Sequence, residues 1–276
     1  MTNMLTGNAS ANSINGGNGD DSLYGIDGND SLNGGLGNDF LDGGNGIDIA
    51  QYYTATAGVT VNLNLTVAQD TGGAGIDTLM NIEVVNGSAY NDILTGNAAN
   101  NTLLGGAGND ILDGRLGNDV LKGGQGQDTF VFDSALGLAN KDAITDFSVS
   151  ADSIQLDDSI FTALTSTGAL AANEFLIIGN GAVADSNDYI QYNSVSGGLF
   201  YDADGSGAGA SVLVAVLGKG LAMTSAGLYG RLSFMGCTTP WPYKKSGSLN
   251  DARFFLFKNA LSLSLGRKYC IFKLAA

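Results

Sequence analysis

The stretch GGNGDDSLYGIDGNDSLNGGLGNDFLDGGNGIDIA, residues 16–50, repeats a pattern every nine residues. Each unit opens with glycine, carries an aspartate at its sixth position and an apolar residue, usually leucine, at its eighth. The period begins at Gly7, and a second array runs from Gly87 to Val131. All ten units begin with glycine and eight of the ten have the aspartate, so composition alone does not explain the register. A fixed short period of this kind predicts a solenoid.

The sixth and eighth positions define the expected coil. The sixth-position residues are Asp21, Asp30, Asp39, Asp48, Asp92, Asp110, Asp119 and Asp128, with Asn12 and Asn101 in the other two units. The eighth-position residues are Ile14, Leu23, Leu32, Leu41, Ala50, Leu94, Leu103, Leu112, Leu121 and Phe130. Because side chains alternate between the faces of a strand, each unit predicts a six-residue turn followed by a three-residue strand with its middle residue inside. Two units make one coil, and coils stack about 4.8 Å apart through parallel strand pairing.

This stacking also brings carboxylates together. Turns of alternate units lie above one another, so we expect Asp21 above Asp39 and Asp30 above Asp48. Without a cation these carboxylates would repel one another. A hard dication such as Ca²⁺ would turn them into ligands, together with turn carbonyls that glycine leaves sterically open. The two arrays therefore predict several calcium ions per chain.

Composition excludes several classes of function. The chain of 276 residues has 42 glycines, two prolines and a net charge of −15, and only two of its acidic residues are glutamates. It contains no histidine, which excludes zinc proteases with histidine ligands and hydrolases with a histidine base. No apolar run is long enough to span a bilayer, and residues 1–10 do not resemble a signal peptide. We also expect no nucleic-acid partner. The aspartate-rich composition is typical of turns and of ligands for hard cations.

The units GGNGDDSLY, GGLGNDFLD, GGAGNDILD and GGQGQDTFV resemble the repeats-in-toxin (RTX, haemolysin-type) consensus G-G-x-G-x-D-x-U-x. The resemblance implies an all-β protein in which a parallel β-roll, a β-helix solenoid of Gly-Asp nonapeptides, binds several Ca²⁺ ions. It also implies the ligands. An ion takes the second and fourth carbonyls and the aspartate of one unit, with the first and third carbonyls and the aspartate of the unit two later.

Carried over by position, the resemblance implies four ligand sets. They are Gly17, Gly19 and Asp21 with Gly34, Leu36 and Asp39; Ile26, Gly28 and Asp30 with Gly43, Asn45 and Asp48; Gly106, Gly108 and Asp110 with Gly123, Gln125 and Asp128; and Ser88, Tyr90 and Asp92 with Gly105, Ala107 and Asp110. Asp119 is a further candidate ligand. Sites that use Asn12 or Asn101 lack a pair of charges, so we expect them to bind weakly or not at all.

The domain organisation follows from where the period holds. Residues 1–51 and 87–131 form the two arrays, and residues 52–86 form a β-rich insertion whose single match, at 72–80, is out of register, which makes Asp77 a weaker ligand candidate. Residues 132–230 resemble the serralysin-type C-terminal region and predict a capping β-sandwich. Within it, Asp146 and Asp152 are candidates to complete a last roll site.

Two later segments admit more than one interpretation. Asp202, Asp204 and Ser206 imitate the start of an EF-hand loop, but the acid required at its last position is missing, so a hairpin turn is favoured. Residues 231–276 form an atypical basic tail, with eight basic residues and one acid. We expect this tail to be a frame-shifted or acquired extension that packs poorly on the body. A membrane-binding amphipathic role is the alternative, and it is less favoured because the apolar run FFLF at 254–257 is short.

Three functions remain open. The first is a secreted protein whose β-rolls fold on calcium after export, with the type I secretion machinery as a partner; it has no catalytic site. The second is an adhesin or carbohydrate-binding fragment that recognises a glycan or cell surface through tyrosines: Tyr52, Tyr53, Tyr189, Tyr192 and Tyr201. The third is an accessory module of a secreted polysaccharide-active enzyme. The first is favoured, because an expanded acidic chain could stay export-competent where calcium is scarce and fold where it is plentiful.

Overall fold

The computed structural model describes residues 1–164, 168–179, 185–205 and 210–231, together with three strands near the C-terminus. It divides into two units, Met1–Arg231 and Leu232–Ala276. The second unit contains an antiparallel sheet of β24 (Arg253–Phe257), β25 (Ala260–Leu265) and β26 (Lys268–Lys273). The side chains of this tail lie outside the described residues, so the expectation that it packs poorly stays a prediction.

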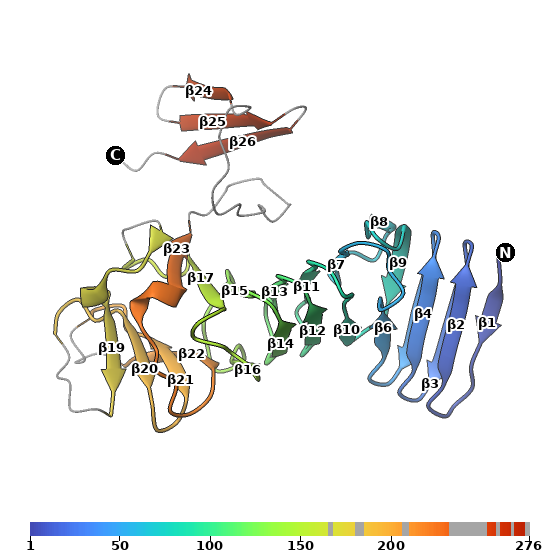
Figure 1. Ribbon diagram of the computed structural model, residues 1–276, viewed down its shortest axis with the longest axis horizontal. Helices are drawn as coiled ribbons and strands as arrows, with labels where there is room; N and C mark the ends of the chain where they lie inside the picture. The colour runs from blue at the N-terminus through green and yellow to red at the C-terminus, as the bar shows by residue number, and fades with distance from the viewer. Residues whose placement is uncertain are drawn as a thin grey trace. The chain divides into compact units, whose positions relative to one another are not determined.

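The first array forms coils with two opposite sheets (Figure 1). One sheet contains β1 (Met4–Thr6), β3 (Ser22–Asp27) and β5 (Phe40–Asn45), and the other contains β2 (Ser13–Asn18), β4 (Ser31–Leu36) and β6 (Ile49–Gln51). All pairings within these sheets are parallel and shifted by 18 residues; Leu23, for example, lies opposite Leu41. This register confirms that two nonapeptides make one coil of a parallel β-roll.

The second array continues the same roll. Its strands are β10 (Val84–Asn86), β12 (Thr102–Ala107) and β14 (Val120–Gln125) on one face, and β11 (Ile93–Thr95), β13 (Ile111–Asp113) and β15 (Thr129–Phe132) on the other. The two arrays are joined directly, because β6 pairs in parallel with β10. One sheet therefore runs without a break through both arrays.

The insertion interrupts only the opposite face. It forms β7 (Thr60–Asn62), β8 (Gln69–Asp70) and β9 (Ile76–Met80). Strand β9 pairs with β5 and places Leu79 opposite Leu41, while β7 pairs with β11 and places Val61 opposite Leu94. The match at 72–80 is thus out of register in sequence but in register in space, and its Asp77 joins the aspartate column of the first array.

The region after the repeats extends both sheets. Its elements are β16 (Asp142–Ile144), β17 (Ser153–Asp157), β18 (Gly168–Ala169), η1 (Ala172–Glu174), β19 (Phe175–Ile178), β20 (Ile190–Asn193), β21 (Gly198–Tyr201), β22 (Val212–Val216), η2 (Ser225–Gly227) and β23 (Leu228–Arg231). Strand β16 pairs with β14, and β17 pairs with β15, so both sheets of the roll continue into the cap. Among the described residues, no helix has the length and hydropathy needed to cross a membrane.

The antiparallel pairing of β21 with β22 decides between the two interpretations of the loop after Tyr201. Tyr201 lies opposite Val212, as expected for a hairpin. The EF-hand interpretation is therefore not supported, although Ser206 itself lies outside the described residues. Asp202 is buried and accepts a hydrogen bond from the Gln191 side chain at 3.1 Å.

The eighth-position side chains form the core of the roll. From Leu23 to Phe130 none of them is more than 1% exposed. Ile14 and Leu5, in the first coil, are only partly buried. Burial of each leucine contributes about 1.5–3 kcal/mol, so this apolar column is the main metal-independent source of stability.

Replacing one member of the column tests its contribution. We expect Leu112→Ala to lower the free energy of unfolding of the calcium-loaded protein by about 2–5 kcal/mol, because Leu112 is fully buried. Urea denaturation followed by circular dichroism measures this loss. Leu116→Ala is the matched control: Leu116 is 44% exposed, and we expect a change within about 0.5 kcal/mol. Equal losses in both variants would contradict the assignment of the core.

Candidate calcium sites

The sixth-position aspartates form two columns along the roll, one on each side. In each column, one carboxylate oxygen is held by the amide of the residue one coil earlier. Asp21 N–H donates to Asp39 Oδ1 at 2.8 Å, and Asp92 N–H donates to Asp110 Oδ1 at 2.8 Å. The same bond joins Asp30 to Asp48 at 2.7 Å and Asp110 to Asp128 at 2.9 Å. This ladder fixes the direction in which each carboxylate points.

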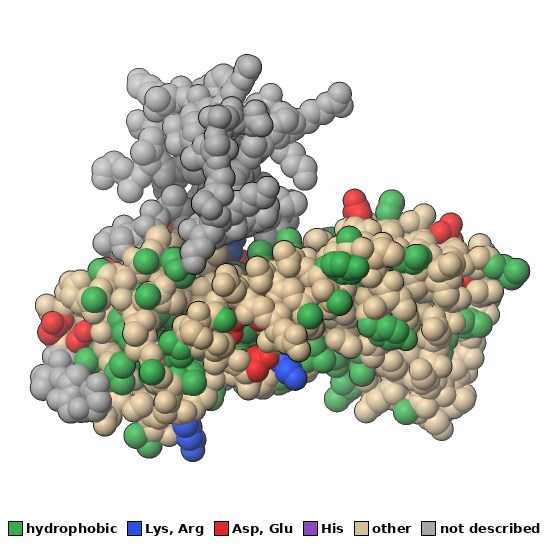
Figure 2. All heavy atoms as spheres, in the orientation of Figure 1, with side chains coloured by type: hydrophobic (Ala, Val, Ile, Leu, Met, Phe, Trp, Pro, Cys, Tyr) green, Lys and Arg blue, Asp and Glu red, His purple; other side chains and the backbone are tan. Residues whose placement is uncertain are grey.

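The second oxygen of most of these carboxylates is buried and has no hydrogen-bond partner. It is the Oδ2 atom of Asp21, Asp30, Asp39, Asp48, Asp110, Asp119 and Asp128. A buried carboxylate oxygen without a partner is costly, because it loses its hydration and gains nothing in return. Few acidic side chains are visible on the face that Figure 2 shows, although the chain has 27 acidic residues. Seven aligned and unpaired oxygens fit a row of cations.

The first-position glycines leave room beside these oxygens. At Gly16 an added Cβ would lie 2.5 Å from Asp21 Oδ2 and 2.7 Å from the carbonyl oxygen of Gly34. The same convergence occurs beside Gly25, with Asp30 and Gly43, and beside Gly105, with Asp110 and Gly123. A side chain would fill this space, and glycine keeps it open to a small hard cation and its carbonyl ligands.

In all four ligand sets implied by the sequence, a carboxylate lies beside the first-position carbonyl; in the fourth set these are Asp92 Oδ2 and the Gly105 carbonyl, beside Gly87. In the other three sets the carboxylate oxygen has no partner. Their third-position carbonyls, from Leu36, Asn45 and Gln125, each accept an amide hydrogen bond from the preceding coil. A carbonyl oxygen has two lone pairs, so one remains for a metal. No three acidic side chains of the described residues converge on one point, which means that main-chain carbonyls must supply much of each coordination shell. The complete ligand sets stay a prediction.

The fourth set differs from the other three. Asp92 Oδ2 accepts the Ser88 amide at 2.5 Å, and its Oδ1 accepts the Ser88 hydroxyl at 2.7 Å. Val59 N–H also donates to Oδ1, at 2.7 Å. Both oxygens of Asp92 are thus occupied within the protein. Asn12 and Asn101, expected to be weak ligands, are likewise occupied: their side-chain oxygens accept the amides of Asn8 and Asn97.

The structure also places acids from outside the two arrays in these columns: Asp77 and Asp152, which were candidates from the sequence, and Glu83 and Asp142, which were not. The Asp39 amide donates to Asp77 Oδ1 at 3.0 Å, and the Asp48 amide donates to Glu83 Oε2 at 3.0 Å. Towards the C-terminal end of the roll, the Asp119 amide donates to Asp142 Oδ1 and the Asp128 amide donates to Asp152 Oδ1, each at 3.0 Å. Asp146, a candidate for the last site, accepts the amides of Gly123 and Gly124 at 3.1 and 2.8 Å.

A second ladder, which the sequence analysis did not predict, lies at the fifth position. Asn91 Oδ1 accepts the amide of Asn109 at 2.8 Å, and Asn109 Oδ1 accepts the amide of Gln127 at 2.9 Å. Equivalent bonds start from Asp20, Asn29, Asn38, Asn100 and Asn118. The preference for asparagine before the aspartate could have revealed this ladder. It joins coils without needing a metal.

With this geometry in place, the family comparison decides the class of repeat. A model described as the RTX calcium-binding nonapeptide repeat matches four times, at residues 2–25, 27–50, 81–112 and 104–134. The chain contains RTX calcium-binding repeats. No curated protein matches it. Among solved structures, the extracellular lipase LipA from Serratia marcescens is similar at 19% identity and a TM-score of 0.26, over 83% of this chain. The chain spans 40% of the length of that lipase.

Burial makes the RTX carboxylates weaker acids. It raises the pKa of Asp110 to about 7, partly offset by the amide bond from Asp92 and increased further by neighbouring carboxylates. In the same way burial raises the pKa of Asp39 and of Asp128 to about 6. Without a cation, these groups therefore hold protons that exposed aspartates would have lost.

The tyrosines proposed for glycan binding mostly belong to the core. Tyr52, Tyr192 and Tyr201 are at most 6% exposed, and Tyr189 packs against the core. Only Tyr53 of this set is exposed, at 59%. The aromatic platform expected for the adhesin interpretation is therefore wrong, because four of its five rings are used in packing.

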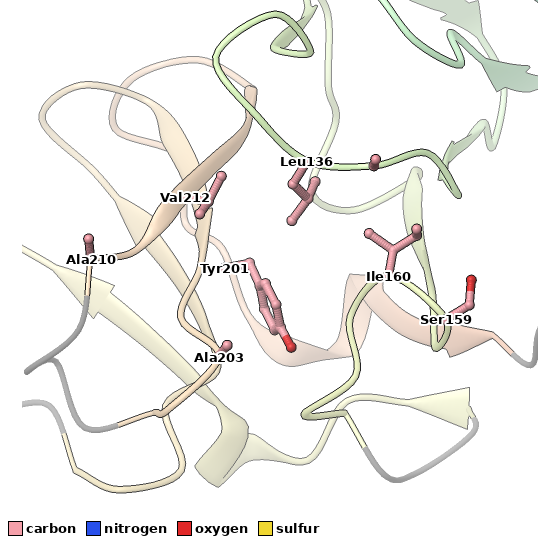
Figure 3. A pocket seen from close by; sticks show the side chains of 8 residues that line it. Leu136, Ser159, Ile160, Tyr201, Ala203, Ala210 and Val212 are labelled. Atoms are coloured by element: carbon pink, nitrogen blue, oxygen red, sulfur yellow. The ribbon is translucent and has the colours of Figure 1, made fainter.

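The cap contains a pocket of about 360 Å³ (Figure 3). It is lined by Ala135, Leu136, Ser159, Ile160, Tyr201, Ala203, Ala210 and Val212. The Tyr201 ring lies in it with Leu136 and Ile160, and its hydroxyl accepts the Ala163 amide at 2.9 Å. These eight lining residues include no carboxylate and no basic group, so they offer no acid–base pair.

The raised carboxyl pKa values predict how the metal-free RTX roll depends on pH. A folded-state pKa above the unfolded value of 3.8 means that the folded roll binds protons more tightly. In chelator, we therefore expect stability to rise as the pH falls from about 8 to about 5, because these carboxyl groups take up protons near pH 6–7 in the folded roll and only near pH 4 in the unfolded chain. Urea midpoints in chelator at the two pH values measure the change. A lower midpoint at the acidic pH would contradict it.

Proposed function

We propose that this chain is an extracellular RTX protein whose roll is completed by calcium after export. The observation that carries the proposal is the set of seven buried, unpaired carboxylate oxygens. Ca²⁺ would neutralise these oxygens and bridge successive coils; Asp21, Asp30 and Asp110 would hold it, with the carbonyls of Gly34, Gly43 and Gly123. The proposal includes no catalytic step.

Charge supports the same function. Residues 1–230 contain 26 acidic and four basic residues, a net charge of −22. Such a glycine-rich polyanion repels itself and resists compaction until cations bind. Sites of the strength usual in extracellular modules, with dissociation constants of about 10⁻⁴–10⁻³ M, would stay empty in the cytosol and fill outside. Binding free energy then becomes folding free energy.

Export by the type I machinery is the route that fits this behaviour. A chain that stays expanded inside the cell can be threaded through a secretion channel. Calcium outside would then favour folding, and the folded roll could not return. The finer biological task, whether attachment to a surface or support of a secreted enzyme, is not needed for this proposal.

A calcium titration in chelator-treated buffer, followed by far-ultraviolet circular dichroism, tests the function. We expect a cooperative gain of β signal near millimolar calcium. Magnesium should produce little of it, because Mg²⁺ demands octahedral geometry and dehydrates reluctantly. A spectrum already folded in chelator and unchanged by calcium would overturn the proposal.

Asp110→Asn sharpens this titration. Asparagine keeps the shape of the side chain but removes the charge that an ion needs, so the midpoint should move to higher calcium. Asp27→Asn is the matched control, because Asp27 is exposed and its carboxylate accepts only the Asn45 side chain among the described contacts. Equal shifts in both variants would point to net charge as the cause and not to a specific site.

A further inference from the structure

The turns of the roll fall into two classes. In a closed turn, the amide of the second residue donates to the side chain at the sixth position. These bonds join Asn8 to Asn12 at 2.7 Å, Ser88 to Asp92 at 2.5 Å, Asn97 to Asn101 at 2.8 Å and Ser148 to Asp152 at 2.8 Å. In an open turn this bond is missing, and the Oδ2 of the sixth residue has no partner.

The backbone separates these eleven turns; the turn at Asp77 belongs to neither class, because Gly75 has a positive φ and Gly73 does not. In all seven open turns the second residue has a positive φ: Gly17, Ile26, Gly35, Gly44, Gly106, Arg115 and Gly124. The fourth residue is a glycine with positive φ in each: Gly19, Gly28, Gly37, Gly46, Gly108, Gly117 and Gly126. In the closed turns neither position has a positive φ, and the fourth residues are Ser10, Tyr90, Ala99 and Ser150.

Local side-chain bonds explain why the closed turns close. Asn8 and Asn97 accept the amide of their fourth residue at 2.9 and 2.8 Å, and the Ser88 hydroxyl accepts that of Tyr90 at 3.1 Å. Serine and asparagine favour such turns because their short polar side chains reach the backbone two residues on. In a closed turn, the amide of the second residue points at the sixth-position side-chain oxygen that a calcium ion would otherwise bind.

We propose that the residues at the second and fourth positions decide whether a turn takes calcium, so that Asp92 and Asp152 bind no ion although each is an aspartate in the ligand column. The proposal rests on the proposed function. The inference goes beyond that function by stating that a sixth-position aspartate alone is not sufficient for a turn to bind calcium. The amide bond occupies the ligand oxygen, and a side chain at the fourth position, which is glycine in every open turn, disfavours the left-handed backbone that such a turn requires. At the second position Ile26 and Arg115 have this backbone in open turns, so there closure is favoured by the bond from a short polar side chain to the fourth amide.

The consequence is a metal-free middle section. Asp77 belongs to the column, but its Oδ2 accepts the hydroxyls of Thr71 at 3.0 Å and Tyr52 at 3.2 Å. With the closed turns at Asp92 and Asn101, hydrogen bonds occupy the centre of the roll, between two blocks of open turns. Two calcium-binding blocks, Asp21–Asp48 and Asp110–Asp128, therefore flank a section that coheres without metal.

Exchanging the turn residues tests the proposal. The double variant Ser88→Gly/Tyr90→Gly should open the turn at Asp92, where the carbonyls of Gly105 and Leu104 already converge beside Gly87. We expect it to bind one more calcium ion than the wild type. Ser88→Ala/Tyr90→Ala is the matched control, because it removes the same side chains without providing glycine, and its ion count should equal that of the wild type.

The reverse variant, Gly17→Asn/Gly19→Ser, should close the turn at Asp21 and bind one ion fewer. A Cβ at residue 17 meets nothing within 4 Å, and one at residue 19 meets only the backbone of Met1, the terminal residue. Native mass spectrometry of the calcium-saturated full chain counts the ions, and circular dichroism confirms that each variant is folded.

An unchanged count in both exchange variants, beside a wild type that binds calcium, would overturn the turn rule and leave the proposed function intact. A wild type without bound calcium would overturn both. If only one exchange variant folds, its count alone decides, since each predicts a change of one ion in a defined direction.

Discussion

The fold depends on one arrangement: a buried aspartate that gives one oxygen to the backbone and keeps the other unpaired. In the open turns Oδ1 accepts an amide from the adjacent coil, as between Asp21 and Asp39, while Oδ2 has no partner. The first bond fixes the spacing of the coils and the second oxygen makes that spacing costly without a cation. In the proposed function, ion binding is therefore coupled to the folding of these open turns.

Two features of the repeats stabilise the roll without a metal. The leucine column from Leu23 to Leu121 is fully buried, and the fifth-position ladder joins coils through neutral amides such as Asn91 and Asn109. The insertion contributes a third feature, since Tyr52 and Thr71 bond to Asp77. A roll that has both kinds of support can hold its shape in the middle while the open turns on either side respond to the ion.

The sequence predicted those features that depend on a strict period. The coil of two nonapeptides, the inward leucines and the stacking of Asp30 over Asp48 all follow from it. Asp77 was judged out of register because 20 additional residues precede it, and only pairing of β9 with β5 reveals its place. The closed turn at Asp92 does have a sequence signal, because Ser88 and Tyr90 stand at the second and fourth positions, where the consensus has glycine. Whether a tyrosine such as Tyr192 packs in the core or faces solvent depends on which face of its strand another sheet covers, and the sequence left both roles open.

The most direct test of the central claim is anomalous X-ray diffraction from crystals of the calcium-loaded chain. The account predicts ion peaks at about 2.3–2.6 Å from the Oδ2 atoms of the open turns, with main-chain carbonyls completing each shell. Asp21, Asp30 and Asp110 should show them first, because the carbonyls beside them already converge. If these oxygens are instead bonded to water or to protein groups, with no anomalous peak nearby, the unpaired carboxylates are not calcium ligands and the account is wrong.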